Sequence, residues 1–362
     1  MKAIKEFIRL NKKMFYVLCG VVGVFVLILI ILLIVKLVNG TKISYEQLQD
    51  KMVIAAENYY DDNTETLPKN EGDEISISVD TLVEKGYLKS LDKLVDASCS
   101  GSVVVKKNGE QYMYYPSLDC GSDYKTRTLG SIITDQSNIV ETGDGLYKTE
   151  DGYVFRGEYV NNYVTFADST WRIISIDNNG NIRMVKEKRE EDSYTWDDRY
   201  NVEADDDLGI NDFSKSRIYE QLKNLYNNEI QNEYKKHLLQ QNICVDKKND
   251  DSSLMSSSCN SYLNSYLGLI YPSEYYKASI DGNCNNYDSN SCINYNYMYN
   301  FIDNSWTSIS YVGNTYQSYF INGYVDHSND CMSRFVNLVV VISDKELYSS
   351  GNGSSENPFV VK

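Results

Sequence analysis

The chain has 362 residues, of which 24% are charged, and its formal net charge is −16 at pH 7. Residues 1–40 contain six Lys or Arg and one Glu, a net +5, which leaves −21 for residues 41–362. A surface of this sign repels polyanions, and this excludes nucleic acid as a partner. The part after residue 40 is long enough for two domains with cores of their own.

The first element expected is a transmembrane helix at residues 14–38, an apolar stretch with no charged residue before Lys36 and no proline. About 20 apolar helical residues span a bilayer core of ~30 Å. Lys and Arg concentrate in residues 1–13, which favours a cytoplasmic tail there and an extracellular C-terminal part. A cleaved signal peptide is the alternative, but its apolar run is normally only about 7–15 residues long. We therefore expect a single-pass anchor in the cell membrane.

Residues 41–125 follow as a stalk helix and a small domain. Apolar residues recur every three or four positions over Ser44–Asn63, and Ser44 with Gln47 fits a capping box. A strand and a short helix ending at Gly86 come next. A hairpin is then expected to turn at Asn108-Gly109, a pair preferred in two-residue turns.

The order of a membrane helix, an amphipathic extension and the stretch "VDTLVEKGYLKSL" resembles the globular head of type IV pilin-like proteins. This resemblance implies an α+β head over residues 41–125 and a role in a pilin-like or secretion assembly. The chain departs from the pattern because no glutamate follows the glycines of the apolar run. Processing by that pathway is therefore not expected.

Residues 126–152 are expected to be a connector, and residues 153–362 a larger C-terminal domain. The pattern predicts a hairpin formed by 171–176 and 181–186, helices starting at 214 and 272, and strands at 306–310, 319–325 and 335–342. The last of these strands is nearly all apolar, which indicates burial on both faces.

Several motifs of this part, "TWRIISIDNNGNIRMV", "LIYPSEYYKAS", "NSWTSIS" and "GNGSSENPFVV", resemble a domain of unknown function. That domain occurs in many anchored surface proteins of low-GC Gram-positive bacteria. The order of its elements also resembles the C-type-lectin-like and formylglycine-generating-enzyme architecture. Together the resemblances imply an α+β fold class: a transmembrane helix, a small pilin-like head and a larger C-type-lectin-like domain. The chain departs from the domain's usual Arg-Pro-Val, because it has Arg334-Phe335-Val336.

Seven of the eight cysteines lie after the membrane segment, where an oxidising exterior permits disulfides. Zinc is not expected, because no CxxC or CxxH spacing occurs. Close spacing favours three pairs and leaves Cys331 over. The pairs are Cys99–Cys120, Cys244–Cys259 and Cys284–Cys292.

Two groups of residues are candidate sites. Carboxylates crowd one segment and would suit Ca²⁺, although charge runs are usually solvated loops; they are Glu203, Asp205, Asp206, Asp207 and Asp212. Aromatic residues crowd a second segment and would suit a carbohydrate or protein ligand; they are Tyr295, Tyr297, Tyr299 and Trp306. The alternation of the three tyrosines also fits one face of a core strand.

The function favoured is non-catalytic binding or adhesion by an extracellular domain, because no assembled catalytic motif is visible. No cofactor is expected other than Ca²⁺. The alternatives are a cell-envelope glycan hydrolase with carboxylates around Asp205 or near His327, and a structural part of a pilin-like assembly. The other histidine, His237, lies near a helix end, where a cation suits the helix dipole.

Overall fold

The computed structural model describes residues 21, 22, 24–26, 28, 42–228 and 230–362. Among these residues, no helix is both long and apolar enough to cross a membrane. The expected cytoplasmic tail, residues 1–13, and most of the expected transmembrane helix, residues 14–38, lie outside the described residues.

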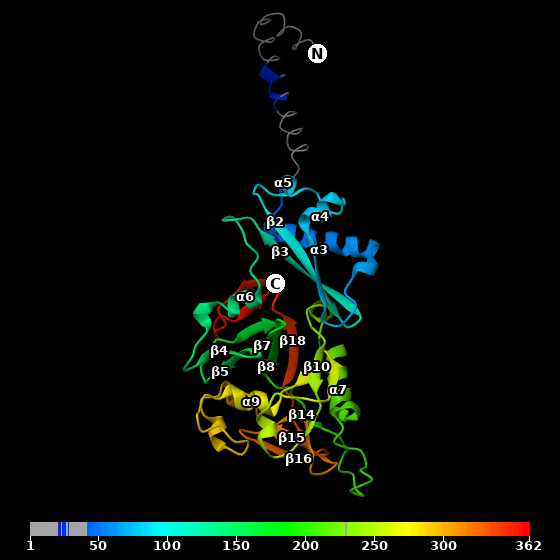
Figure 1. The fold of residues 1–362 in the computed structure, drawn as a ribbon, viewed down its shortest axis with the longest axis vertical. Coiled ribbons are helices and arrows are strands. Elements are labelled where there is room, and N and C mark those ends of the chain that lie inside the picture. The colour runs from blue at the N-terminus through cyan, green and yellow to red at the C-terminus, as the bar shows by residue number, and fades with distance from the viewer. Residues whose placement is uncertain (1–20, 23, 27, 29–41, 229) are drawn as a thin grey trace, which may run out of the picture. The chain divides into compact units, whose positions relative to one another are not determined.

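The described chain forms two compact units (Figure 1). The smaller unit contains the residues up to Lys69, together with Asp73–Lys106 and Pro116–Thr126. The larger unit contains Asn70–Gly72, Lys107–Tyr115 and Arg127–Lys362.

The smaller unit is built on helix α3 (Tyr45–Asp62) and a three-stranded sheet in the order β1-β2-β3. The side chain of Ser44 accepts from the backbone N–H of Gln47, and the Gln47 side chain accepts from the backbone of Ser44, so the predicted capping box is confirmed. One face of α3 buries Leu48, Met52 and other apolar side chains, as its periodicity predicts. The remaining elements are η1 (Thr64–Thr66), β1 (Glu74–Ser78), α4 (Val79–Glu84), α5 (Leu91–Leu94), β2 (Ser100–Asn108) and β3 (Gln111–Asp119), of which the ends next to the β2–β3 turn, Lys107–Tyr115, belong to the larger unit.

The β2–β3 hairpin turns one residue later than predicted. Its two turn residues are Gly109 and Glu110, and Gly109 has φ 60°, which a glycine adopts without strain. Asn108 ends β2 instead, because its side chain is buried and bonded elsewhere: Nδ2 donates to the Leu238 carbonyl at 2.9 Å, and Oδ1 accepts from the Gln240 N–H at 2.7 Å. With both strands nine residues long, Cys99 and Cys120 lie directly beyond their paired ends.

The larger unit contains a nine-stranded sheet with the path β13-β18-β8-β7-β6-β20-β19, and β5 joins β4 to β7. The predicted hairpin forms its centre, with Ile176 opposite Ile182, and β18 pairs with β8 so that Ile342 also faces Ile182. Every residue of β18 is buried, as its apolar run predicts. The strands are β4 (Gly145–Thr149), β5 (Gly152–Arg156), β6 (Tyr163–Phe166), β7 (Ser169–Asp177), β8 (Asn181–Lys186), β13 (Gly268–Leu269), β18 (Leu338–Ser343), β19 (Tyr348–Ser350) and β20 (Phe359–Val361).

A second sheet of four strands, β11-β14-β15-β16, belongs to the same unit, and Figure 1 shows β14, β15 and β16 together. Trp171 from the nine-stranded sheet and Trp306 from the four-stranded one are both fully buried in one hydrophobic core. The strands are β11 (Lys247–Lys248), β14 (Ser305–Tyr311), β15 (Gln317–Ile321) and β16 (Val325–Asn329). Two further pairs are β10 (Gln241–Cys244) with β12 (Tyr262–Ser265), and β9 (Tyr194–Thr195) with β17 (Ser333–Arg334).

Helices contribute little to the larger unit. They are α6 (Leu129–Ile133), α7 (Arg217–Asn228), α8 (Asn232–Lys235) and α9 (Pro272–Ala278), with the 3₁₀ turns η2 (Gln136–Asn138), η3 (Phe213–Lys215), η4 (Ser252–Met255), η5 (Asn290–Ile293) and η6 (Tyr297–Asn300). The long segment between β10 and β14 is rich in Asn, Ser and Tyr, which favour turns and strands over helix.

The predicted α+β class, with its pilin-like head and C-type-lectin-like domain, is therefore wrong, because the fold is mostly β. Two segments account for much of the difference. The expected connector contains β4, which forms a hairpin with β5. The single strand expected at residues 319–325 is divided, because 319–321 end β15, 322–324 form a turn and β16 begins at Val325.

Candidate functional site

Three disulfides occur in the described chain, and they join the pairs that the spacing favours. The Cα atoms of Cys99 and Cys120 are 4.1 Å apart at the open end of the β2–β3 hairpin. Among the described cysteines Cys331 is free, and burial raises its pKa. Each bridge closes a loop of the chain, which stabilises the fold mainly by restricting the unfolded state.

The acidic segment that would suit Ca²⁺ forms a loop before α7, and its carboxylates serve local contacts. Asp205 accepts from the Tyr200 hydroxyl, Asp206 accepts from the N–H of Asp207 at 2.8 Å, and Asp212 binds Lys215 at 3.1 Å. Within the described residues, no three of the five carboxylates, which include that of Glu203, bring oxygens within 4.8 Å of one another. The calcium site stays a prediction.

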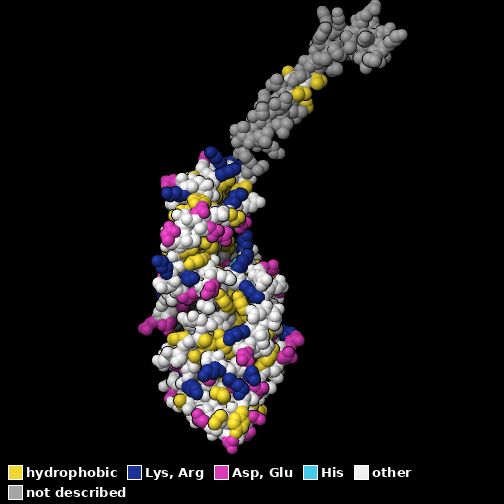
Figure 2. All heavy atoms as spheres, turned by 90° about the vertical axis from the view of Figure 1, so that its right-hand side faces the viewer, with side chains coloured by type: hydrophobic (Ala, Val, Ile, Leu, Met, Phe, Trp, Pro, Cys, Tyr) yellow, Lys and Arg dark blue, Asp and Glu magenta, His cyan; other side chains and the backbone are white. Residues whose placement is uncertain are grey.

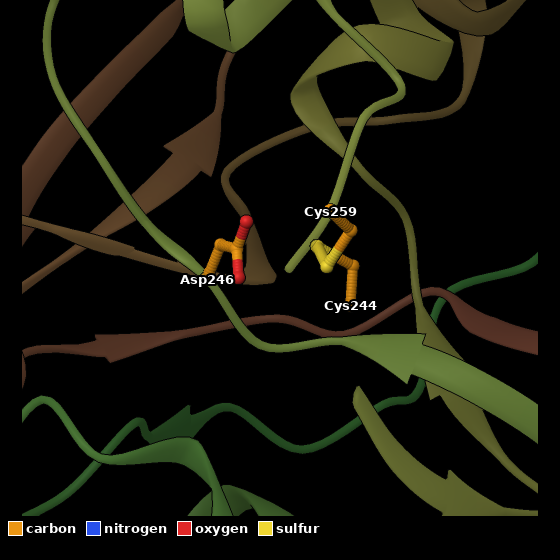
Figure 3. A group of neighbouring side chains, drawn as sticks. All are labelled: Cys244, Asp246 and Cys259. Carbon is orange, nitrogen blue, oxygen red and sulfur yellow. A yellow bond between two sulfur atoms is a disulfide. The ribbon is translucent and has the colours of Figure 1, made fainter. Parts of the chain in front are cut away.

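The side chains of Cys244, Asp246 and Cys259 do meet at this spacing (Figure 3). The two sulfurs are bonded to each other, so neither is the thiolate that a metal needs. Asp246 accepts from the N–H groups of Asn260 at 2.9 Å and Ser261 at 2.8 Å. In the oxidised protein this group is a structural clip for the loop that carries Cys259.

His327 on β16 lies in a cluster with Asp250 and two tyrosines. Its Nε2 is 3.1 Å from the Asp250 carboxylate, its ring stacks on Tyr311 at 4.1 Å between centroids, and the Tyr319 hydroxyl donates to Asp250 at 3.0 Å. Burial, then the charge of Asp250, raises the pKa of Tyr319. The Nδ1 of His327 is buried and has no hydrogen-bond partner among the described residues.

This geometry bears on the hydrolase alternative. A general base must reach the proton that it abstracts. The Nε2 of His327 lies beside Asp250 and its Nδ1 is buried, so Nδ1 does not reach an external substrate, and the hydrolase alternative stays a prediction. His237 likewise is engaged, since its Nδ1 lies 2.8 Å from Glu346, a residue that is 4% exposed.

The four predicted aromatic ligand residues separate into two buried and two exposed side chains. Tyr297 is fully buried, and the Trp306 Nε1 donates to the Tyr194 carbonyl at 2.9 Å, so both belong to the core. Tyr295 is 57% exposed and Tyr299 is 48% exposed. Their alternation does not come from a strand, because residues 297–300 form the 3₁₀ turn η6.

Tyr299 is part of a larger surface at the end of the β15–β16 hairpin. A Cβ placed on Gly323 would lie 3.2 Å from Tyr299 Cε2, so the ring lies against the hairpin turn, and the neighbouring Tyr324 is 48% exposed. The hydroxyl of the buried Tyr275 donates to the Gly323 carbonyl at 2.7 Å and fixes the turn from below.

Arg334, on β17, extends this surface by lying over a residue of β15. Its guanidinium lies 3.3 Å from the centroid of Phe320 and donates to Asn304 Oδ1. Burial lowers the pKa of Arg334, and the exposed Asp326, which lies opposite Phe320 in the register, opposes that shift. We call the group formed by Tyr299, Tyr324, Asp326, Arg334 and Asn304 the hairpin-tip surface.

The sequence pattern missed Tyr324, Asp326, Arg334 and Asn304. The pair Asn322-Gly323 is a hairpin-turn signal that would have divided the expected strand and exposed Tyr324. Arg334 and Asn304 carry no such signal, because they meet only through a bridge between Ser305 and Phe335.

Two other parts of the surface are less suited to ligands than this one. A hollow of about 560 Å³ in the smaller unit has no aromatic side chain in its lining, and its Lys42 is bonded to the carbonyls of Asp92 and Val95. On the face shown in Figure 2, acidic and basic side chains are interspersed and apolar ones lie in small groups.

The chain matches no protein-family model, no curated protein and no solved structure.

Proposed function

We propose that the protein is a membrane-anchored, extracellular binding protein whose larger unit holds a carbohydrate at the hairpin-tip surface without catalysis. The observation that carries the proposal is that two half-exposed tyrosine rings and a planar cation gather around the end of the β15–β16 hairpin. The anchor itself rests on the apolar segment and the basic residues 1–13.

The chemistry of this surface fits a neutral sugar better than an ion. Tyrosine rings give rigid contact area for the C–H faces of a pyranose at low entropic cost. Asp326, Arg334 and Asn304 add an acceptor, a planar donor and an amide, which suit hydroxyl groups. Because the charges of Asp326 and Arg334 oppose each other, the surface selects no strongly charged ligand.

The turn is also held in one conformation before any ligand arrives. Gly323 has φ 75°, its carbonyl accepts from Tyr275, and the N–H of Asn322 donates to the Tyr324 carbonyl at 2.9 Å. A preorganised surface loses little entropy on binding, so even a shallow site retains affinity.

A glycan array probed with the purified full chain tests the proposal. We expect binding to neutral oligosaccharides, weakened roughly 2–10-fold by Tyr299→Ala and by Tyr324→Ala, because each removes one stacking ring. Arg334→Lys keeps the charge but loses the planar fork, and it should also weaken binding.

Tyr262→Ala is the matched control, since Tyr262 is a 56% exposed tyrosine on another strand, β12. Equal loss in this variant would show that tyrosine removal acts unspecifically. Binding only to proteins on a parallel surface-protein screen would replace the carbohydrate with a protein ligand. Glycan cleavage by the full chain would replace binding with hydrolysis.

A further inference from the structure

The segment after β8 encloses a hollow of about 310 Å³. Its lining consists of Lys186, at the end of β8, of residues 188–192 and of Tyr194, on β9. Three of these side chains are cations and three are carboxylates, so their charges balance. The volume lies at the lower end of the range for small-molecule sites, about 300–1,000 Å³. A balanced, hydrogen-bonding lining suits a small hydroxylated group better than an apolar or strongly charged one.

Two connections place this hollow next to the hairpin-tip surface. Tyr194 of its lining lies directly opposite Arg334 in the antiparallel pair of β9 and β17. Opposite residues of such a pair project from the same face, with Cβ atoms about 4.5–5.5 Å apart. The Arg189 guanidinium donates to the Asp303 carboxylate at 2.8 Å, and Asp303 precedes Asn304 of the hairpin-tip surface. A ligand that extends beyond Arg334 therefore meets the hollow.

Glu190 provides an unused acceptor in the hollow. Its side chain is only 9% exposed, and one carboxylate oxygen, Oε1, accepts from the Lys186 Nζ at 2.7 Å. The Glu190 N–H donates to the Val336 carbonyl at 3.0 Å, which holds the backbone in place. No described residue donates to the other oxygen, Oε2. A carboxylate held at one oxygen and unused at the other is a well-oriented acceptor for a ligand hydroxyl.

The cations of the lining differ in how firmly they are held. Arg189 is bonded to Asp303 and lies 3.5 Å from the centroid of the Phe335 ring, so its position is fixed. Lys188 is 76% exposed and pairs at 2.8 Å with Glu191, which is 84% exposed. An exposed pair of this kind contributes little to stability, so Lys188 can exchange Glu191 for a ligand oxygen at small cost. The hollow thus combines a fixed acceptor with an available donor.

We propose that the hollow is a second sugar subsite, so that the protein binds an oligosaccharide of at least two residues. One sugar stacks on Tyr299 and Tyr324, and a sugar further along the chain donates a hydroxyl to Glu190 Oε2 and accepts from Lys188. The inference rests on the proposed function and specifies its ligand as a chain of neutral, hydroxyl-rich sugars. Glu190 is then a specificity-determining residue, because a sugar that lacks this hydroxyl leaves a buried acceptor unpaired.

Calorimetric titration of the full chain tests the subsite, with a length series of the oligosaccharide that binds best on the array. We expect affinity to rise roughly tenfold between the monosaccharide and the first member that reaches the hollow, because a hydrogen bond to a charged group is worth about that factor. Glu190→Gln keeps an oxygen for Lys186 and turns a nitrogen toward the hollow. This variant and Lys188→Ala should each remove most of the rise and leave monosaccharide affinity unchanged. Tyr324→Ala should weaken every member of the series.

Lys215→Ala is the matched control for Lys188→Ala, because Lys215 is 72% exposed and pairs with Asp212 at 3.1 Å, outside the hollow. This control should keep the full rise. Circular dichroism shows whether Glu190→Gln folds, and if it does not, Lys188→Ala decides.

The two proposals fail in different ways. Affinity that does not rise with chain length, or a rise that persists in Lys188→Ala and in folded Glu190→Gln, would overturn the subsite and leave binding at the hairpin-tip surface intact. An equal loss of monosaccharide and oligosaccharide affinity in Lys188→Ala would also overturn it, because Lys188 would then not act on a second sugar. If no member of the series binds, the proposed function fails and the subsite fails with it.

Discussion

Glu274 and Arg183 form an ion pair inside the larger unit, and breaking it should be costly. Their side chains are only 11% and 13% exposed, and Arg183 also donates to Gln241 Oε1 at 2.6 Å and the Leu269 carbonyl at 2.9 Å. Although burial opposes its charge, the Glu274 carboxylate raises the pKa of Arg183. Glu274→Gln would leave a buried guanidinium without its counter-charge.

The expected loss follows from that burial. Removing one partner of a buried pair costs about 3–5 kcal/mol. The Glu274 carboxylate accepts a hydrogen bond from the Tyr271 N–H at 2.8 Å, and the glutamine oxygen can accept it too. The start of α9 is therefore preserved, and the loss of stability measures the loss of the charge. For a unit of this size, roughly 2–4 °C of Tm accompany each kcal/mol, which predicts a decrease of about 6–20 °C.

Differential scanning calorimetry measures this decrease. Glu191→Gln is the control, because Glu191 forms an exposed pair with Lys188 and should leave Tm unchanged. The double variant Arg183→Met with Glu274→Gln should recover part of the loss, since no buried charge remains. Equal Tm values for Glu274→Gln and Glu191→Gln would refute the reasoning.

Three further predictions concern redox state, pH and topology. Alkylation without reduction should label Cys331 and spare the six bridged cysteines, as read by peptide mapping; label on any of those six would count against its bridge. Burial raises the pKa of Glu346, and its partner His237 opposes the rise. Between the pKa of Glu346 in the unfolded protein and its pKa in the folded protein, the folded state therefore holds more protons. The free energy of unfolding should fall as pH rises through this range. Urea titrations at several pH values measure this dependence, and Glu346→Gln should make the free energy of unfolding depend less on pH. An unchanged pH dependence would contradict this. Protease added to intact cells should digest residues 41–362, and their protection would reverse the orientation.

Local signals predicted local structure well. The cap formed by Ser44 and Gln47 depends on residues three positions apart, and the turn at Asp177–Gly180 is stabilised by Asp177 accepting from the N–H groups of Asn179 and Asn181. Contacts of this kind join residues only a few positions apart, so the local sequence pattern indicates them. The three short disulfide loops belong to the same class, because near neighbours along the chain meet most easily.

The features that the sequence did not predict depend on contacts between residues that are far apart in the chain. Asn108 ends β2 instead of occupying the turn, because its side chain bonds to Leu238 and Gln240, which lie 130 and 132 residues away in the sequence. The hairpin-tip surface joins Tyr299, at η6, to Arg334, on β17, and no periodicity links them. Half of the predicted aromatic set proved to be core for the same reason, since burial depends on neighbours that the local pattern does not contain.

Hydrogen–deuterium exchange of the full chain, with and without the oligosaccharide that binds best on the array, tests the central claim most directly. Binding at the hairpin-tip surface predicts slower exchange of the amides in residues 322–327, and in the segments around Tyr299 and Arg334. This protection should be lost in Tyr324→Ala and kept in Tyr262→Ala. Protection confined to any other part of the chain, with these three segments unchanged, would contradict the account.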